Sequence, residues 1–216
     1  MKNCTPHRIT EKWGWVVRLF RAGVLVSVAG LGLSGCFRQG QSTQFYMLQA
    51  MAAPESIPRS GEGPLVGLGP IRIPAYLDRA QIVVAESGQE YRISEAHRWA
   101  EHLDENIARI SAQNLSNLIP SDRIVPHPWP RDSKPDIEVS LNLQEMHVDS
   151  SGDVRMTASW RLRQGKSEVV SRRFVCRLPA SLTDYSVMVR QDSECLVRLN
   201  RDMADAIRAL PPQALR

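Results

Sequence analysis

The chain has 216 residues, of which 43% are hydrophobic, and its 27 basic and 23 acidic residues give a formal net charge of +4. This length suits one folded domain with a hydrophobic core. A basic chain usually indicates an acidic partner, but five of the basic residues and one acidic residue lie within residues 1–35. The remainder carries 22 basic and 22 acidic residues and has no basic stripe with interleaved aromatic residues, which excludes nucleic-acid binding.

Residues 1–35 have the layout of a secretory signal, in which a basic front precedes an apolar run from Ala22 to Gly35. This run has 14 residues, whereas a transmembrane helix needs about 20. It ends in Leu33-Ser34-Gly35-Cys36, and a cysteine behind two small residues resembles the lipobox of bacterial lipoproteins. The resemblance implies that the chain is cut before Cys36, which then carries diacylglycerol and an acylated amino group. An ordinary cleaved signal and a signal anchor are the alternatives.

Such an anchor predicts where the protein lies, because two or more acyl chains hold a protein stably on a membrane. Phe37 stands where an aspartate would favour retention at the inner membrane, so we expect the outer membrane, with the domain facing the periplasm. We predict a lipidated cysteine with a flexible tether over residues 36–44, because 38–43 are mostly polar and include Gly, Ser and Gln. Residues 45–212 are predicted to form a single periplasmic domain.

Two cysteines, Cys176 and Cys195, remain in the predicted domain after Cys4 is removed with the signal and Cys36 carries lipid. Two thiols in an oxidising periplasm suggest one disulfide. Two separately buried thiols are the alternative, because a sequence does not show whether two Cα atoms lie within bridging distance.

The first half of the domain is expected to contain strands and one helix. Residues 45–48 predict a short strand, and residues 51–64, with three prolines, predict a loop. Residues 65–73 are again extended, with Pro70 and Pro74 restricting this strand to an edge or a break. Residues 81–84 and 91–93 predict a hairpin. Ser94 then stands as a helix N-cap, and apolar residues at helical spacing predict a helix from there to 118.

The second half predicts three strands and a closing helix. Alternating apolar residues predict strands over 137–148, with a bulge near Gln144 or Glu145, over 154–162, and over 169–178. Three successive antiparallel strands form a meander with one apolar face, and a helical stripe from Tyr185 to Leu210 supplies a cover. The predicted fold class is α+β, an α/β sandwich of an antiparallel meander with two long helices on one face.

Motifs for catalysis and metal binding are not found after residue 35, where no GxSxG, HExxH, CxxC or P-loop pattern occurs. Gly67 and Gly69 form a GxG with no following helix or lysine, which does not predict a phosphate loop. On the predicted helix, His97 and His102 lie too far around the axis to share a metal, and His97 with Glu101 is interpreted as a solvated pair. We therefore predict no catalytic residue, metal or cofactor.

The tryptophans divide into two kinds. Trp99 and Trp160 fall on apolar faces and are predicted to lie in the core. Trp129 is flanked by Pro128 and Pro130, so it is held in a stiff loop. It either packs against the domain or marks an exposed contact site.

The stretch from Gly67 to Val83, with Pro74, Tyr76, Leu77 and Asp78 at its centre, resembles the signature of ABC-type transport auxiliary lipoproteins. The family pattern is a glycine-rich strand, a proline, a Tyr-Leu-Asp-Arg turn and a Gln-Ile-Val strand. A helix then opens around Trp-Ala-Glu, present here as Trp99-Ala100-Glu101. Pro74, Tyr76, Leu77 and Asp78 are expected to build a turn; contact with a partner is the second interpretation.

This resemblance implies a non-catalytic outer-membrane lipoprotein that assists lipid transport and so supports membrane integrity. Its implied partners are an inner-membrane permease, an ATPase and an MCE-domain protein, and it leaves a homo-oligomer open. An assembly or scaffolding lipoprotein that binds a β-barrel or envelope protein is the first alternative function. A periplasmic hydrolase is the second.

Overall fold

The centre of the sheet is a meander of three long antiparallel strands. The computed structural model describes residues 42–53, 63–119, 121–130 and 133–211. Within them β6 (Ile137–Val148), β7 (Asp153–Gln164) and β8 (Ser167–Pro179) pair in order, which confirms the predicted meander. The register between β6 and β7 shifts between Leu143 and Glu145, so the predicted bulge is present and falls at Gln144.

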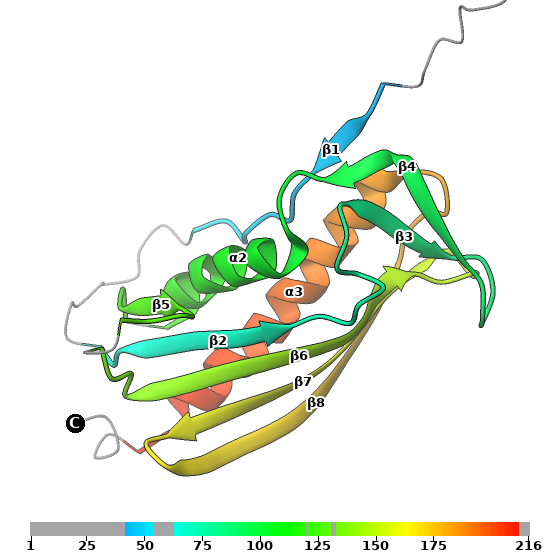
Figure 1. The fold of residues 1–216 in the computed structure, drawn as a ribbon. Coiled ribbons are helices and arrows are strands. Elements are labelled where there is room, and N and C mark those ends of the chain that lie inside the picture. Colours follow the sequence, from blue (N-terminus) through cyan, green and yellow to red (C-terminus); the bar gives the residue numbers. More distant parts are fainter. Residues whose placement is uncertain (1–41, 54–62, 120, 131–132, 212–216) are drawn as a thin grey trace, which may run out of the picture. The chain divides into compact units, whose positions relative to one another are not determined.

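The rest of the sheet is mostly parallel, so the predicted purely antiparallel sheet is wrong. β2 (Val66–Arg72) lies parallel to β6, and β5 (Ile124–Pro126) lies parallel to β2. β3 (Gln81–Ala85) meets the far end of β6 in parallel and forms the predicted hairpin with β4 (Tyr91–Trp99). β1 (Gln44–Tyr46) runs parallel to β4. Among the described strands, four of the seven pairs are parallel, and the sheet is mixed and curled (Figure 1).

Two of the parallel pairs, β2–β5 and β2–β6, depend on a helix that returns the chain to the end of the sheet where β2 begins. α2 (Leu103–Leu118) carries the chain back, so β5 and β6 enter the sheet in the direction of β2. β2 consequently lies between β5 and β6, and the expectation of an edge strand is wrong. The expected break is present, because the β2–β6 register shifts between Leu68 and Ile71, on either side of Pro70.

The first helix begins later than the sequence predicts. Residues 94–99 continue β4, and the helix starts only at Leu103, with His102 rather than Ser94 as its N-cap residue. The Ser94 hydroxyl does accept a hydrogen bond from the His97 backbone N–H, at 3.2 Å, as an N-cap would. Here that bond lies within a bulge of β4. Between the paired positions Val83–Ile93 and Gln81–Arg98, β4 has three more residues than β3. A hydrogen bond typical of a helix N-cap is therefore found inside a bulged strand.

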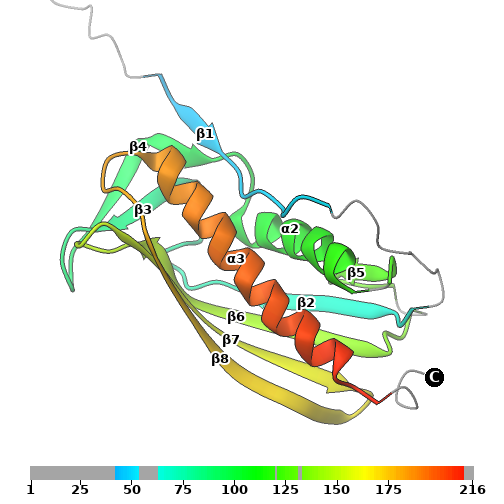
Figure 2. The same cartoon turned by 180° about the vertical axis from the view of Figure 1, so that it is seen from behind.

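Both helices cover one face of the sheet, as predicted (Figure 2). α3 (Tyr185–Arg208) crosses β6, β7 and β8, while α2 lies over β2 and β5. The Asp184 side chain caps α3 by accepting hydrogen bonds from the backbone N–H groups of Ser186 and Val187. Trp160 and Trp99 are both buried beneath this layer, which confirms their predicted core positions. None of the helices in the described ranges is long and apolar enough to span a membrane.

A polar network fastens α3 to the inner face of the meander. Buried Trp160 donates its indole N–H to Asp202 on α3, at 3.0 Å. The same carboxylate accepts a hydrogen bond from the Arg172 guanidinium at 2.6 Å, and this guanidinium lies 5.7 Å from the centre of the Trp160 ring. The indole N–H is thereby satisfied although the ring is fully buried.

Candidate binding groove

The turn predicted from the family motif lies where the sheet forks. β6 pairs with β2 along its first half and with β3 only at Val148, so the turn that joins β2 to β3 runs beside the unpaired part of β6. Within this turn Leu77 is buried and its backbone N–H donates to the Pro74 carbonyl at 2.9 Å, whereas Asp78 is exposed. The motif thus supplies one core side chain and one that faces solvent.

Tyr76 connects this turn to β6. Its hydroxyl lies 3.2 Å from Nδ1 of buried His147, and its ring packs 5.3 Å from that of Tyr91. Burial raises the pKa of Tyr76 to about 12, against the opposing effect of a hydrogen bond with the Met146 backbone. Burial also lowers the pKa of His147. The tyrosine therefore stays protonated and occupies the fork.

Trp99 and the motif turn lie close together, although Trp99 follows Ala80 by 19 positions in the chain. The Trp99 backbone N–H donates to the Ala80 carbonyl at 2.6 Å, which closes the turn against the end of β4. The supposed His97–Glu101 helix pair is wrong, because His97 lies on β4 and stacks 3.8 Å from Tyr185, while Glu101 binds Asn106 and Arg109.

The two cysteines of the domain form a disulfide. Cys176 on β8 and Cys195 on α3 are joined, with their Cα atoms 5.7 Å apart, and both are buried. The bond fixes the closing helix to the last strand of the meander. Cys36 and residues 1–41 lie outside the described residues, so the lipid anchor stays a prediction.

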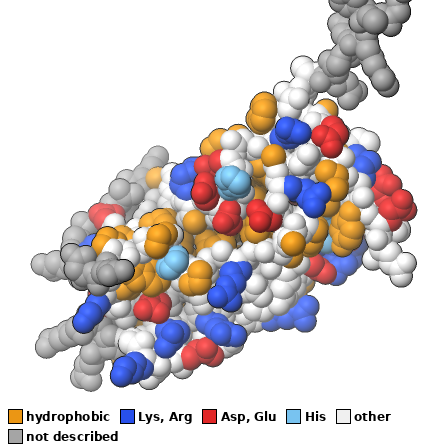
Figure 3. All heavy atoms as spheres, in the orientation of Figure 1, with side chains coloured by type: hydrophobic (Ala, Val, Ile, Leu, Met, Phe, Trp, Pro, Cys, Tyr) orange, Lys and Arg blue, Asp and Glu red, His pale blue; other side chains and the backbone are white. Residues whose placement is uncertain are grey.

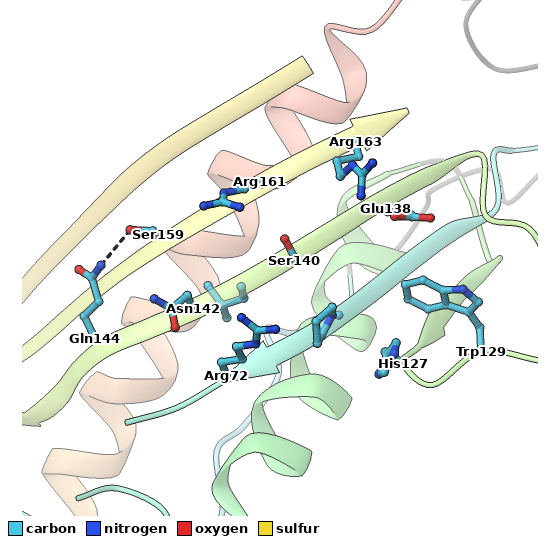
Figure 4. Close-up of a pocket in the computed structure, with 13 residues that line it drawn as sticks. Arg72, His127, Trp129, Glu138, Ser140, Asn142, Gln144, Ser159, Arg161 and Arg163 are labelled. Carbon is cyan, nitrogen blue, oxygen red and sulfur yellow. Dashed lines mark hydrogen bonds between the residues drawn. The ribbon is translucent and has the colours of Figure 1, made fainter. Parts of the chain in front are cut away.

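A groove of about 640 Å³ lies on the face of the sheet that the helices leave uncovered, and the sequence did not predict it (Figure 4). Its first wall is the loop after β5, which folds over β2 with His127 and Trp129. The close approach needs glycine on β2. A Cβ on Gly67 would lie 2.6 Å from Pro135 and 3.1 Å from Trp129, and one on Gly69, whose φ is +128°, would lie 2.5 Å from His127.

The floor of the groove consists of outward-facing side chains of β6. Strand alternation directs the apolar residues of β6 to the core and leaves four polar ones outside. These four are Glu138, Ser140, Asn142 and Gln144. The bulge at Gln144 brings its amide to the Ser159 hydroxyl of β7, at 3.0 Å, which closes one end of the floor (Figure 4).

Arginines from two strands surround this floor. Arg161 and Arg163 rise from β7, and Arg72 rises from β2 on the other side of β6 (Figure 4). With Glu138 the three arginines give the groove lining a formal charge of +2. Basic side chains also gather on the lower part of this face, over the region of β6 to β8 (Figure 3). The groove is thus polar and electropositive, which suits a negatively charged ligand or partner.

Trp129 forms part of the wall and is half-buried rather than fully exposed. Its ring meets the His127 ring edge-to-face at 5.0 Å. From the sequence, Trp129 either packs against the domain or marks an exposed contact site. The structure supports packing against the domain, and one side of the Trp129 ring also lines the groove. Gly67 and Gly69 were the available signal for this wall, since two alternate glycines on a strand indicate close approach of another segment.

Among the described residues, no group of three or more His, Cys, Asp or Glu side chains is placed to hold a metal ion. The groove holds hydroxyl, amide, guanidinium and one carboxylate group. Such groups bind and orient a polar ligand.

The comparisons with known proteins agree on one family. A family model described as "ABC-type transport auxiliary lipoprotein component" matches residues 46–204. The chain is 23% identical over 187 residues to the Escherichia coli protein named "Intermembrane transport lipoprotein PqiC", covering 87% of this chain and 98% of that one. The Shigella flexneri protein of the same name matches equally.

Two solved structures share the fold. One, titled as an uncharacterized protein, has a TM-score of 0.64 at 22% identity and covers 77% of this chain and 99% of its own. The other, from Xanthomonas campestris, has a TM-score of 0.59 at 14% identity and covers 74% of this chain and 92% of its own. At these identities the structures support the arrangement of helices and sheet.

Proposed function

Because this chain belongs to the ABC-type transport auxiliary lipoprotein component family, we propose that it is a non-catalytic, lipid-anchored subunit that assists transport of lipids across the envelope. The observation that carries the proposal is the family match over residues 46–204, which takes in most of the described fold. The match to almost the whole length of proteins named as intermembrane transport lipoproteins supports the same role.

The proposed location is the outer membrane, facing the periplasm. It rests on the sequence, where Leu33-Ser34-Gly35-Cys36 resembles a lipobox and Phe37 replaces the aspartate of inner-membrane retention. Residues 1–35 would be removed, residues 36–44 would form the anchor and tether, and residues 45–212 would form the working domain. A tethered domain has a raised effective concentration near its membrane, which favours a partner reaching across the periplasm.

The proposed partners are an MCE-domain protein, an ABC permease and its ATPase. Within the described residues the groove is the surface best suited to contact, because its walls are fixed by packing and its floor offers exposed polar groups. The exposed Asp78 of the motif turn is a second place for partner contact.

In vivo photo-crosslinking tests this proposal. A photoreactive residue at Ser140, on the groove floor, should crosslink to an MCE-domain protein, whereas one at exposed Arg198, on the outer side of α3, should not. Deletion of the gene should increase sensitivity to detergent. Absence of both the crosslink and the phenotype would contradict the transport role, and capture of a β-barrel protein from both positions would favour an assembly lipoprotein instead.

A further inference from the structure

We propose that the groove binds a phosphate group, held between Arg72 and Arg161 above Ser140 and Asn142. This site goes beyond the proposed transport role and does not depend on it. The first support is strand register. Arg72 of β2 lies opposite Asn142 of β6, and Ser140 of β6 lies opposite Arg161 of β7.

This register places the two arginines on either side of the same strip of floor. β2 and β7 both flank β6, so they lie about 10 Å apart, twice the spacing of neighbouring strands. Arg72 and Arg161 therefore stand diagonally across β6 and can reach over Ser140 and Asn142 from opposite sides (Figure 4). An anion on the floor would meet one guanidinium from each side and a hydroxyl and an amide from below.

The charges in the groove are incompletely balanced. Arg163 lies opposite Glu138 across β6 and β7, so these two opposite charges are neighbours. Arg161 has only a long contact with Glu168, at 3.7 Å, between two exposed side chains. Among the residues that the structure describes, none provides Arg72 with a carboxylate partner. One guanidinium without an ion pair and another with a weak one therefore face the same floor.

The donor set favours phosphate over a carboxylate. One guanidinium can already satisfy both oxygens of a carboxylate, in a single plane. A phosphate group presents three or four oxygens in different directions and makes use of donors arranged around it. Two arginines on opposite sides with hydroxyl and amide groups beneath match the latter arrangement. The half-buried Trp129 ring beyond them offers an apolar surface for whatever the phosphate is attached to.

A binding experiment with the full lipidated chain, reconstituted in nanodiscs of neutral lipid, tests this site. Calorimetric titration would use glycerol 3-phosphate, monomeric short-chain phosphatidylglycerol, and glutarate as the carboxylate probe. We expect saturable binding of at least one phosphate compound, weakened tenfold or more by Arg72→Gln and by Arg161→Gln. Arg201→Gln, an exposed arginine on α3, removes the same charge outside the groove and should leave binding unchanged.

The outcomes separate the sources of the phosphate and the ways in which the proposal fails. Binding of short-chain phosphatidylglycerol alone would identify a lipid headgroup, whereas binding of glycerol 3-phosphate with equal or higher affinity would identify a soluble phosphate ester. If glutarate bound as tightly as both phosphate compounds, the proposal would be overturned in favour of an acidic peptide. Failure of both phosphate probes to bind, or equal loss in Arg201→Gln, would overturn it as well. Arg72 and Arg161 are both exposed. Circular dichroism of each variant checks that it remains folded.

Discussion

Gly67 and Gly69 are the residues on which the groove wall depends. At these two positions the outer surface of β2 carries no side chain, and the loop carrying His127 and Trp129 fills that space. In a sequence this pair is easily taken for a nucleotide-binding GxG. The two glycines instead let the side chains of Pro135, Trp129 and His127 pack against the backbone of β2, which only the folded chain shows.

Gly67→Ala should destabilise the protein by about 1–3 kcal/mol, because the new Cβ would lie 2.6 Å from Pro135 and the well-packed wall must move. Chemical denaturation of the purified protein measures the change. Gly88→Ala is the matched control, since a Cβ there meets nothing within 4 Å. Equal stability of Gly67→Ala and the unaltered protein would show that the loop does not pack on β2 as described.

Asp192 makes stability depend on pH. This carboxyl is buried on α3 with Oδ1 unpaired, and burial raises its pKa to about 8. The folded chain keeps the proton up to about pH 8, whereas the unfolded chain releases it near the ordinary aspartate pKa of 3.8. The free energy of unfolding should therefore fall as pH rises between these two values.

Asp192→Asn should remove that dependence and stabilise the protein at pH 8 by about 5 kcal/mol, the linkage energy of a pKa raised from 3.8 to about 8, since a neutral amide cannot ionise in the core. Thermal unfolding from pH 5 to pH 8 measures it. Asp205→Asn, at an exposed position on the same helix, is the control and should follow the unaltered protein. An Asp192→Asn curve parallel to that of the unaltered protein would contradict the assignment.

At the scale of elements, the disulfide ties α3 to β8. Replacing both Cys176 and Cys195 with alanine should lower the free energy of unfolding by about 2–4 kcal/mol, because the unfolded chain loses a crosslink over 19 residues. Denaturant titration measures the loss. Reductant should lower the free energy of unfolding of the unaltered protein and leave that of the double variant unchanged. If reductant also destabilised the double variant, its effect would not come from this disulfide.

The elements that the sequence predicts well are those with an uninterrupted period. The meander, the bulge at Gln144 and α3 are all present, because strict alternation or a long helical stripe has no equally good second interpretation. Residues 94–99 are different. Ser94 followed by apolar residues at helical spacing resembles a capped helix, yet pairing with β1 and β3 keeps the segment in a strand. Tertiary hydrogen bonds outside the local window decide such a case.

At the scale of the whole molecule, the sequence does not show which strands lie side by side. The direction of α2 makes β2, β5 and β6 parallel, and the groove exists only because β2 and β7 flank β6. Arg72 and Arg161 are 89 positions apart in the chain, so no spacing in the sequence predicts that they share a site. The candidate site therefore had no sequence signal apart from the two glycines, whereas the motif turn and Trp99 could be located from their resemblance.

The largest consequence for the whole molecule follows from Cys36. If this cysteine carries the lipid, the basic residues before it are lost, and the remaining 22 basic and 22 acidic residues leave the protein formally neutral. Long-range attraction to an anionic membrane would then be weak, so that the acyl chains must provide the membrane affinity. Cys36→Ala should therefore abolish labelling by radioactive palmitate and remove the protein from the outer-membrane fraction. Cys4→Ala, which alters a cysteine of the signal alone, should be labelled and sorted normally, and equal labelling of the two variants would contradict the anchor.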